Sequence, residues 1–191
     1  MPSLPPKLLA INSSPKESGH TAHLLKLFID SAQALGAQVK KLDLYEEHIK
    51  PYSGILGKKL KKLNHFQKAL VEADGFVIAT PTYWFNEPGI LKNFIDSLTP
   101  LEENNWMLEG KVAGFIVYSP EGGETEVLEN LAMTFNQMGV AFPPYSLIFY
   151  RGPQDKWAIA DSKLLAKSLI QQISAQKQLK FNWNYDYQIF N

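Results

Sequence analysis

The feature that most constrains the fold is a regular alternation of short apolar runs with longer amphipathic segments. The clearest apolar run is residues 75–80, which is apolar on both faces, as a central strand of a parallel sheet should be. Residues 20–35 carry leucines and a phenylalanine near helical spacing, and the run stops at Gly36, a residue favoured just after a helix. Such alternation is typical of βαβ units and a parallel sheet.

Five strands and five helices are expected in strict alternation. The expected strands cover residues 7–12, 39–44, 75–80, 111–118 and 146–150. The expected helices cover residues 20–35, 60–72, 88–98, 124–138 and 158–178. Right-handed crossovers place such helices on both faces of one sheet. We therefore expect an α/β fold, a three-layer α/β/α sandwich, in one domain that spans residues 1–191.

The composition excludes several classes of function. The chain contains no cysteine, which removes disulfides, thiolate metal sites and the nucleophile of low-molecular-weight phosphatases. Lysine plus arginine equal aspartate plus glutamate at 19 each, so no net charge draws the chain to nucleic acid or to an anionic membrane. The basic run at residues 58–62 fits a solvated helix face better than a nucleic-acid patch.

No stretch approaches the roughly 20 apolar residues of a membrane span. No apolar signal-like segment precedes residue 7, so we expect a cytoplasmic location and no membrane partner. The last residues, 179–191, are strongly aromatic for a chain end. They either pack on their own domain, or cross to a second subunit or border a ligand cleft.

The loop at residues 13–21 follows the first expected strand, and open parallel sheets bind ligands beyond the carboxyl ends of their strands. Ser14, Ser18 and Thr21 supply hydroxyls there, and Lys16 supplies a positive charge. Together with the free N–H groups of a helix start they form an anion site. A monophosphate fits best, because the glycine patterns of triphosphate and dinucleotide loops are missing. A polar turn with a helix cap is the alternative.

Two further loops leave the same edge. Residues 83–85 are three consecutive aromatics that cannot all enter one core, so some should lie over the cleft, where they suit a flat heteroaromatic ring. Asn86 both donates and accepts, as the edge of a pyrimidine requires. A hydrophobic dimer contact is the alternative. Gly122 and Gly123 offer unobstructed N–H groups to ring carbonyls, or form a tight turn. The three loops together fit an elongated ligand with the shape of FMN.

At these residues the chain resembles the NAD(P)H-dependent FMN reductase family of flavodoxin-like proteins. Residues 13–21 are similar to its phosphate loop, although Ser13 replaces glycine, Lys16 replaces arginine and His20 stands where asparagine or serine is common. Residues 81–96 are similar to the family pattern P-x-Y-x-x-x-x-P-G-x-L-K-N-x-x-D. The resemblance covers roughly residues 7–150.

The resemblance implies a sheet in the order 2-1-3-4-5, non-covalent FMN, NAD(P)H as co-substrate, frequent homodimers, and reduction of flavins, quinones or similar small acceptors. Carried over by position, the phosphate contacts are Ser14, Lys16, Ser18, His20 and Thr21; the isoalloxazine contacts are Pro81, Thr82, Tyr83, Trp84, Phe85 and Asn86; and the contacts at its other edge are Ser119, Pro120, Glu121, Gly122 and Gly123. No catalytic acid or base and no metal ligand is expected, because the cofactor carries the reaction.

Two other functions are compatible with such a fold. A flavodoxin-type electron carrier would dock on a protein partner, but such carriers are usually strongly acidic and this chain has no net charge. A flavin-binding module without turnover is the second alternative, with the aromatic tail and a dimer surface serving interaction.

Overall fold

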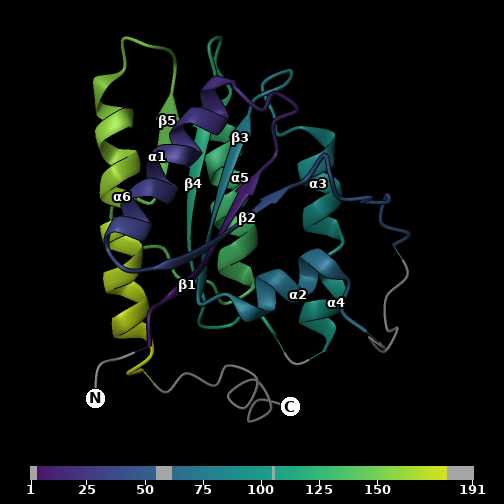
Figure 1. Cartoon of the computed structure of the whole chain (residues 1–191). Helices are drawn as coiled ribbons and strands as arrows, with labels where there is room; N and C mark the ends of the chain where they lie inside the picture. Colours follow the sequence, from purple (N-terminus) through teal and green to yellow (C-terminus); the bar gives the residue numbers. More distant parts are fainter. Residues whose placement is uncertain (1–3, 55–61, 105, 180–191) are drawn as a thin grey trace.

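A five-stranded parallel sheet in the order β2-β1-β3-β4-β5 forms the centre of the computed structural model (Figure 1). The structure describes residues 4–54, 62–104 and 106–179. The strands are β1 (Lys7–Asn12), β2 (Gln38–Asp43), β3 (Gly75–Pro81), β4 (Val112–Tyr118) and β5 (Leu147–Tyr150). The helices are α1 (His20–Ala34), α2 (His65–Glu72), α3 (Gly89–Asp96), α4 (Thr99–Glu103), α5 (Glu124–Gln137) and α6 (Lys156–Gln176). The predicted strand order is confirmed.

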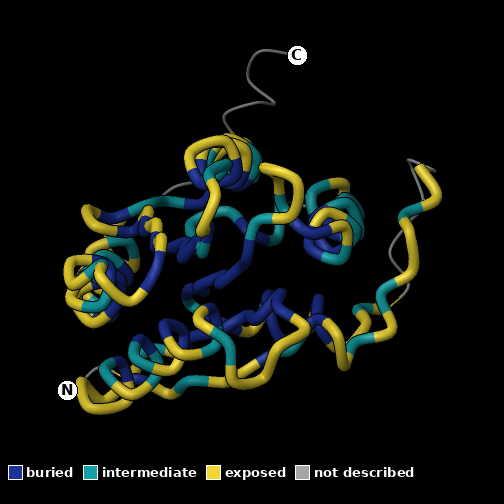
Figure 2. The backbone as a smooth tube through the Cα atoms, turned by 90° about the horizontal axis from the view of Figure 1, so that it is seen from above, coloured by how far each residue is buried: buried dark blue, intermediate teal, exposed yellow. Residues whose placement is uncertain are grey.

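Helices cover both faces of the sheet, so the predicted α/β/α sandwich is confirmed (Figures 1 and 2). On one face α1 and α6 lie side by side and bury Phe28 and Leu165 completely. On the other face α2, α3 and α5 bury Phe94 and Phe135 completely. β3 lies in the middle of the sheet and is buried along its whole length, which explains why residues 75–80 are apolar on both faces.

The strand register brings three strand ends to one edge of the sheet. Asn12, at the end of β1, pairs with Ala79 of β3, and Pro81, at the end of β3, pairs with Tyr118 of β4. The loops that follow β1, β3 and β4 therefore start next to one another. This is the edge at which a parallel sheet of this topology binds ligands.

The second predicted helix begins later than expected. Residues 62–64 are not helical, and α2 starts at His65, because Asn64 caps it. The Asn64 side chain accepts a hydrogen bond of 2.8 Å from the Gln67 N–H, and the Gln67 side chain accepts one of 3.1 Å from the Asn64 N–H. This reciprocal pair is a capping box, which fixes the first helical residue. The earlier part of the prediction, and most of the basic run 58–62, lies outside the described residues.

The third predicted helix, residues 88–98, corresponds to α3, and a short helix that was not predicted follows it. α3 ends at Asp96, and the short helix α4 begins at Thr99. The Ser97 hydroxyl donates to the Phe94 carbonyl at 2.6 Å, and Pro100 has no N–H with which to continue the α3 ladder. The backbone turns more tightly here, because the Leu98 N–H donates at 2.9 Å to the carbonyl of Ile95, three residues back.

None of the helices in the described part of the chain is long and apolar enough to cross a membrane.

Candidate functional site

A cavity of about 710 Å³ opens at the edge of the sheet where β1, β3 and β4 end. Twelve residues line it: Ser14, Lys16, Ser18, Gly19, His20, Thr21, His23, Pro81, Thr82, Tyr83, Tyr118 and Pro120. Its volume lies within the range of small-molecule and cofactor sites. One lysine and two histidines are among the lining residues and no carboxylate is, so the wall favours an anionic ligand.

The loop after β1 is held in shape by Asn12, which is fully buried. Its side-chain amide donates to the Ser14 carbonyl at 3.0 Å and to the Asp43 carboxylate at 2.7 Å, and its oxygen accepts from the Ser14 N–H at 3.1 Å. The Ser14 hydroxyl in turn accepts from the Lys16 N–H at 3.2 Å. Ser13, which stands where a glycine is usual, has a buried hydroxyl that donates to the Ala79 carbonyl at 3.3 Å.

The first turn of α1 points into this loop without a side-chain cap. Gly19 is the N-cap residue, and no described side chain accepts a hydrogen bond from the turn that follows it. Helix N-termini carry unsatisfied N–H groups and the positive end of the helix dipole. Ser18 and Lys16 line the cavity beside them, so the groups that the sequence predicts for an anion site lie together at this position.

The loop after β3 forms a tight turn. Tyr83 and Asn86 exchange two backbone hydrogen bonds of 2.8 and 3.1 Å, and Trp84 and Phe85 between them have left-handed φ angles of 51° and 63°. Trp84 is 95% exposed and Phe85 is 60% exposed. The Asn86 oxygen accepts from the Glu87 N–H at 2.9 Å. Of the three aromatics only Tyr83 lines the cavity.

The loop after β4 is fastened to the aromatic turn. The Thr82 hydroxyl donates to the Ser119 hydroxyl at 3.0 Å, and the Ser119 oxygen accepts from the Gly122 N–H at 2.9 Å. Gly123, with φ at 90°, packs so closely on the turn that a Cβ there would lie 2.5 Å from the Phe85 Cα. The two loops therefore have to move together.

Behind this loop, the buried carboxylate of Glu124 pairs with Arg151, which follows β5. Burial opposes ionisation of Glu124, but hydrogen bonds from its own backbone N–H and from Arg151 outweigh it and lower the pKa of Glu124. The pair ties the start of α5 to the residue that follows β5.

His20, Tyr118 and Tyr150 form an aromatic cluster at one wall. The ring centroid of His20 lies 4.7 Å from that of Tyr118 and 5.7 Å from that of Tyr150. Burial, followed by the neighbouring Tyr118 and Asp155, raises the pKa of Tyr150. His20 was expected to contact a phosphate, and its ring packs against the tyrosines while still lining the cavity.

The structure brings nine of the sixteen predicted residues together at the cavity wall and leaves seven away from it. The nine are Ser14, Lys16, Ser18, His20, Thr21, Pro81, Thr82, Tyr83 and Pro120. The seven are Trp84, Phe85, Asn86, Ser119, Glu121, Gly122 and Gly123. Asn86 lines a different cavity, of about 440 Å³, between α3 and α5. Three lining residues, Gly19, His23 and Tyr118, are not among the predicted contacts.

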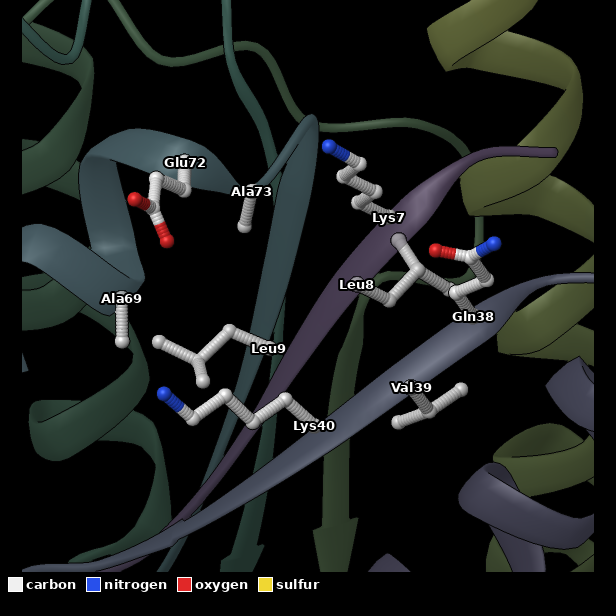
Figure 3. A pocket seen from close by; sticks show the side chains of 9 residues that line it. All are labelled: Lys7, Leu8, Leu9, Gln38, Val39, Lys40, Ala69, Glu72 and Ala73. Carbon is white, nitrogen blue, oxygen red and sulfur yellow. The ribbon is translucent and has the colours of Figure 1, made fainter. Parts of the chain in front are cut away.

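Another cavity lies at the opposite, amino ends of the strands, between α2 and the β1–β2 pair (Figure 3). Lys7 and Lys40 flank it, and Leu9 and Ala69 form apolar parts of its wall. At about 200 Å³ it is smaller than most ligand sites, and it is far from the loops at the carboxyl edge. Within the described residues, no group of three histidines or carboxylates is placed to hold a metal ion.

Comparison with known families identifies one match over most of the chain. The model of the NADPH-dependent FMN reductase family matches residues 6–152, which include all three loops of the cavity. Among curated proteins, an iron-sulfur flavoprotein of Archaeoglobus fulgidus is 28% identical over 199 residues, covering 91% of this chain and 98% of that protein.

Solved structures share the fold. RosB, in a structure with bound 8-demethyl-8-formylriboflavin-5'-phosphate, superposes with a TM-score of 0.80 at 15% identity, covering 96% of this chain and 85% of that one. The apo form of the NADH:FMN oxidoreductase EmoB superposes with a TM-score of 0.62 at 24% identity, covering 92% and 90%. Both likenesses establish a flavodoxin-like fold.

Proposed function

The chain belongs to the NADPH-dependent FMN reductase family, and from this premise we propose that it binds FMN in the 710 Å³ cavity and works as an NAD(P)H-dependent oxidoreductase. The chemistry that FMN supplies when bound is the transfer of two electrons from a reduced nicotinamide to a flavin, a quinone or a similar small acceptor. The observation that carries the proposal is the uncapped start of α1 beside hydroxyls and a lysine, at the carboxyl edge of the sheet.

In this proposal the loop after β1 holds the phosphate. The N–H groups of the first turn of α1 donate to it, the hydroxyls of Ser18 and Thr21 add further donors, and Lys16 balances its charge. Asn12 is not assigned a contact with the phosphate; its three side-chain hydrogen bonds hold the loop in shape in the absence of a ligand. The absence of carboxylates from the wall spares the phosphate any close repulsion.

The ring is assigned to the space between Tyr83 and the loop after β4. Tyr83 and Tyr118 supply aromatic wall, and Pro81 and Pro120 supply rigid apolar wall. Gly123 keeps the proposed role of offering a backbone N–H group, whereas the Gly122 N–H already donates to the Ser119 hydroxyl. Asn86 lines the cavity between α3 and α5 and is dropped from the ring contacts. The chain contributes binding and orientation, and the proposal assigns no catalytic acid or base.

The relatives named iron-sulfur flavoproteins raise the question of a cluster in this chain. Iron-sulfur clusters are held by cysteine thiolates, in some cases partly by histidine. The chain has no cysteine among its 191 residues, so its donor set does not fit a cluster. We propose that the flavin is the sole redox centre and that electrons leave it directly for the acceptor. Purified protein is expected to contain no iron and no acid-labile sulfide, and stoichiometric amounts of both would contradict this.

The binding proposal is tested by titrating the apoprotein with FMN and with riboflavin, which differ only in the phosphate. FMN should bind at least about 100-fold more tightly, because hydrogen bonds to a charged group contribute about 1.5–3 kcal/mol each. In Lys16→Ala this preference should fall about 10-fold. Lys26→Ala is the matched control, since Lys26 is an exposed lysine on α1 paired with Asp30. Equal affinity for the two flavins would overturn the assignment.

Turnover is tested separately by an absorbance spectrum of the purified protein before and after anaerobic NADPH, followed by a quinone. The flavin bands should bleach with NADPH and return with the quinone. A bound flavin that stays oxidised would rule out the reductase and favour a binding module. Comparing the rates at which NADH and NADPH bleach the flavin bands gives the preferred electron donor.

We also propose a homodimer, as the family resemblance implies. The exposed side chains of Trp84 and Phe85 next to the cavity support it, because large apolar groups at such exposure suit an interface. Sedimentation should show a dimer for the native chain and a shift to monomer for Trp84→Ser. A native monomer at micromolar concentration would contradict the proposal.

A further inference from the structure

Two adjoining cavities lie at the end of the molecule opposite the flavin cavity. One, of about 440 Å³, includes Asp74 and Lys111, the residues that precede β3 and β4. The other, of about 470 Å³, lies between the ends of α5 and α6. The two share four lining residues, Trp106, Glu109, Gln176 and Leu179, and so form one continuous hollow, here named the basal trough.

The half of the trough between α5 and α6 has an apolar floor and a rim of amides. Val140, Ala141 and Leu179 contribute the apolar surface. The amide side chains on its rim are Asn136, Gln137, Gln172 and Gln176, and one carboxylate, that of Glu109, lines it as well. Because an amide both donates and accepts, such a rim suits an uncharged polar backbone or other amides better than an ion.

The described part of the chain ends inside this trough, at Leu179. Of the 12 residues that follow, 180–191, the first ten alternate polar and apolar side chains. The apolar positions are Phe181, Trp183, Tyr185, Tyr187 and Ile189, and the polar positions between them are Asn182, Asn184, Asp186 and Gln188. A period of two is the pattern of a segment with one apolar and one amide-rich face, and 12 residues reach about 40 Å at most.

We propose that residues 181–190 occupy the basal trough of their own chain and fasten α6 to the α4–β4 loop and to the end of α5. The chemistry matches on both sides, with aromatics for the apolar floor and amides for the amide rim. The segment starts within the trough, so its effective concentration there is far above that of any second copy. The inference does not depend on flavin binding, because the flavin cavity lies at the carboxyl ends of the strands.

The absence of cysteine allows a direct test in the full-length chain. Gln172→Cys, on the rim, is combined with Asn184→Cys or with Asp186→Cys, which leave every aromatic residue in place. Under mild oxidation at low protein concentration, a disulfide within one chain should form at least about 10-fold faster than in the control that carries Gln171→Cys. Gln171 is exposed on the same helix and lies outside the trough.

Equal rates for the two positions, or a bond between two chains, would overturn the proposal, the latter by assigning the segment to a second copy. A second measurement needs no cysteine. Gln172→Trp fills the trough and should expose the segment, so that trypsin cleaves after Lys180 about 10-fold faster than in Gln171→Trp. Identical cleavage rates would refute the inference as well.

Discussion

Alanine at Gly123 is the most informative single change near the cavity. Gly123 has a φ of 90°, and a Cβ there would lie 2.5 Å from the Cα, 2.6 Å from the carbonyl oxygen and 2.7 Å from the carbonyl carbon of Phe85. All three neighbours are backbone atoms, which cannot turn aside as a flexible side chain would. The loop after β4 and the aromatic turn must therefore separate to admit one methyl group.

The expected cost has two parts. A residue with a Cβ in the left-handed region costs about 1 kcal/mol, and overpacking a fitted contact adds about 2 kcal/mol. Gly123→Ala should thus lower the free energy of unfolding by about 3 kcal/mol. Because Pro120 and Tyr83 border the same cavity, the displacement should also weaken FMN binding by at least about 10-fold, or about 1.4 kcal/mol.

Gly36→Ala is the matched control. Gly36 follows α1 with a φ of 88°, and a Cβ there would meet nothing within 4 Å. It carries the conformational cost alone, about 1 kcal/mol, and should leave FMN binding unchanged. Urea unfolding gives the stabilities, and flavin fluorescence titration gives the affinities. If the two variants lose the same stability and bind FMN alike, the close contact with Phe85 has no energetic weight and the reasoning is refuted.

Three other predictions concern charged groups. Burial, followed by the charge of Glu109, raises the pKa of Glu102 from 4.5 to about 7. The contribution of Glu102 to stability is therefore present below pH 4.5 and is lost as the pH rises through 7. In thermal unfolding, Glu102→Gln should raise the free energy of unfolding by about 1 kcal/mol at pH 8, a value reduced for solvent screening, and should not raise it at pH 4. Lys111 donates to two carbonyls at the end of α2, at 2.7 and 2.6 Å, so Lys111→Met should cost about 2 kcal/mol in urea unfolding, whereas an unchanged midpoint would show that these bonds are dispensable. Arg151→Ala should destabilise by about 1 kcal/mol at pH 7, and because the lowered pKa of Glu124 contributes only above its own titration, the gap to the native chain should close as the pH falls below about 4.

The parallel sheet could be predicted because strands such as β3 and β4 are apolar runs that alternate with amphipathic segments, whereas the strand order came from the family resemblance. The errors lie at helix ends. Asn64 and Gln67 set the start of α2 through side-chain bonds, and Ser97 ends α3 in the same way. Such local bonds leave no trace in hydrophobic periodicity, although an asparagine followed three residues later by glutamine is a capping signal that could have been used.

The cavity-lining residues of the loop after β1 could be predicted because they are contiguous and follow one strand. The aromatic loop was predictable only in part, since left-handed φ angles at Trp84 and Phe85 direct them away from the cavity wall, and composition does not reveal such angles. Tyr118 was read as a strand residue. Its place as the last residue of β4 could have marked it, because strand ends face the ligand edge.

The turn between Tyr83 and Asn86 sets thermostability against the proposed dimer contact in any laboratory evolution of this protein. Its two central positions adopt left-handed φ angles that Asn-Gly would adopt at little cost. Each bulky residue there lowers the stability of the fold by about 1 kcal/mol. A library screened for heat resistance alone is therefore expected to replace Trp84 and Phe85 early. Screening rounds that alternate heat challenge with a test of dimer formation would be needed to keep the aromatic pair.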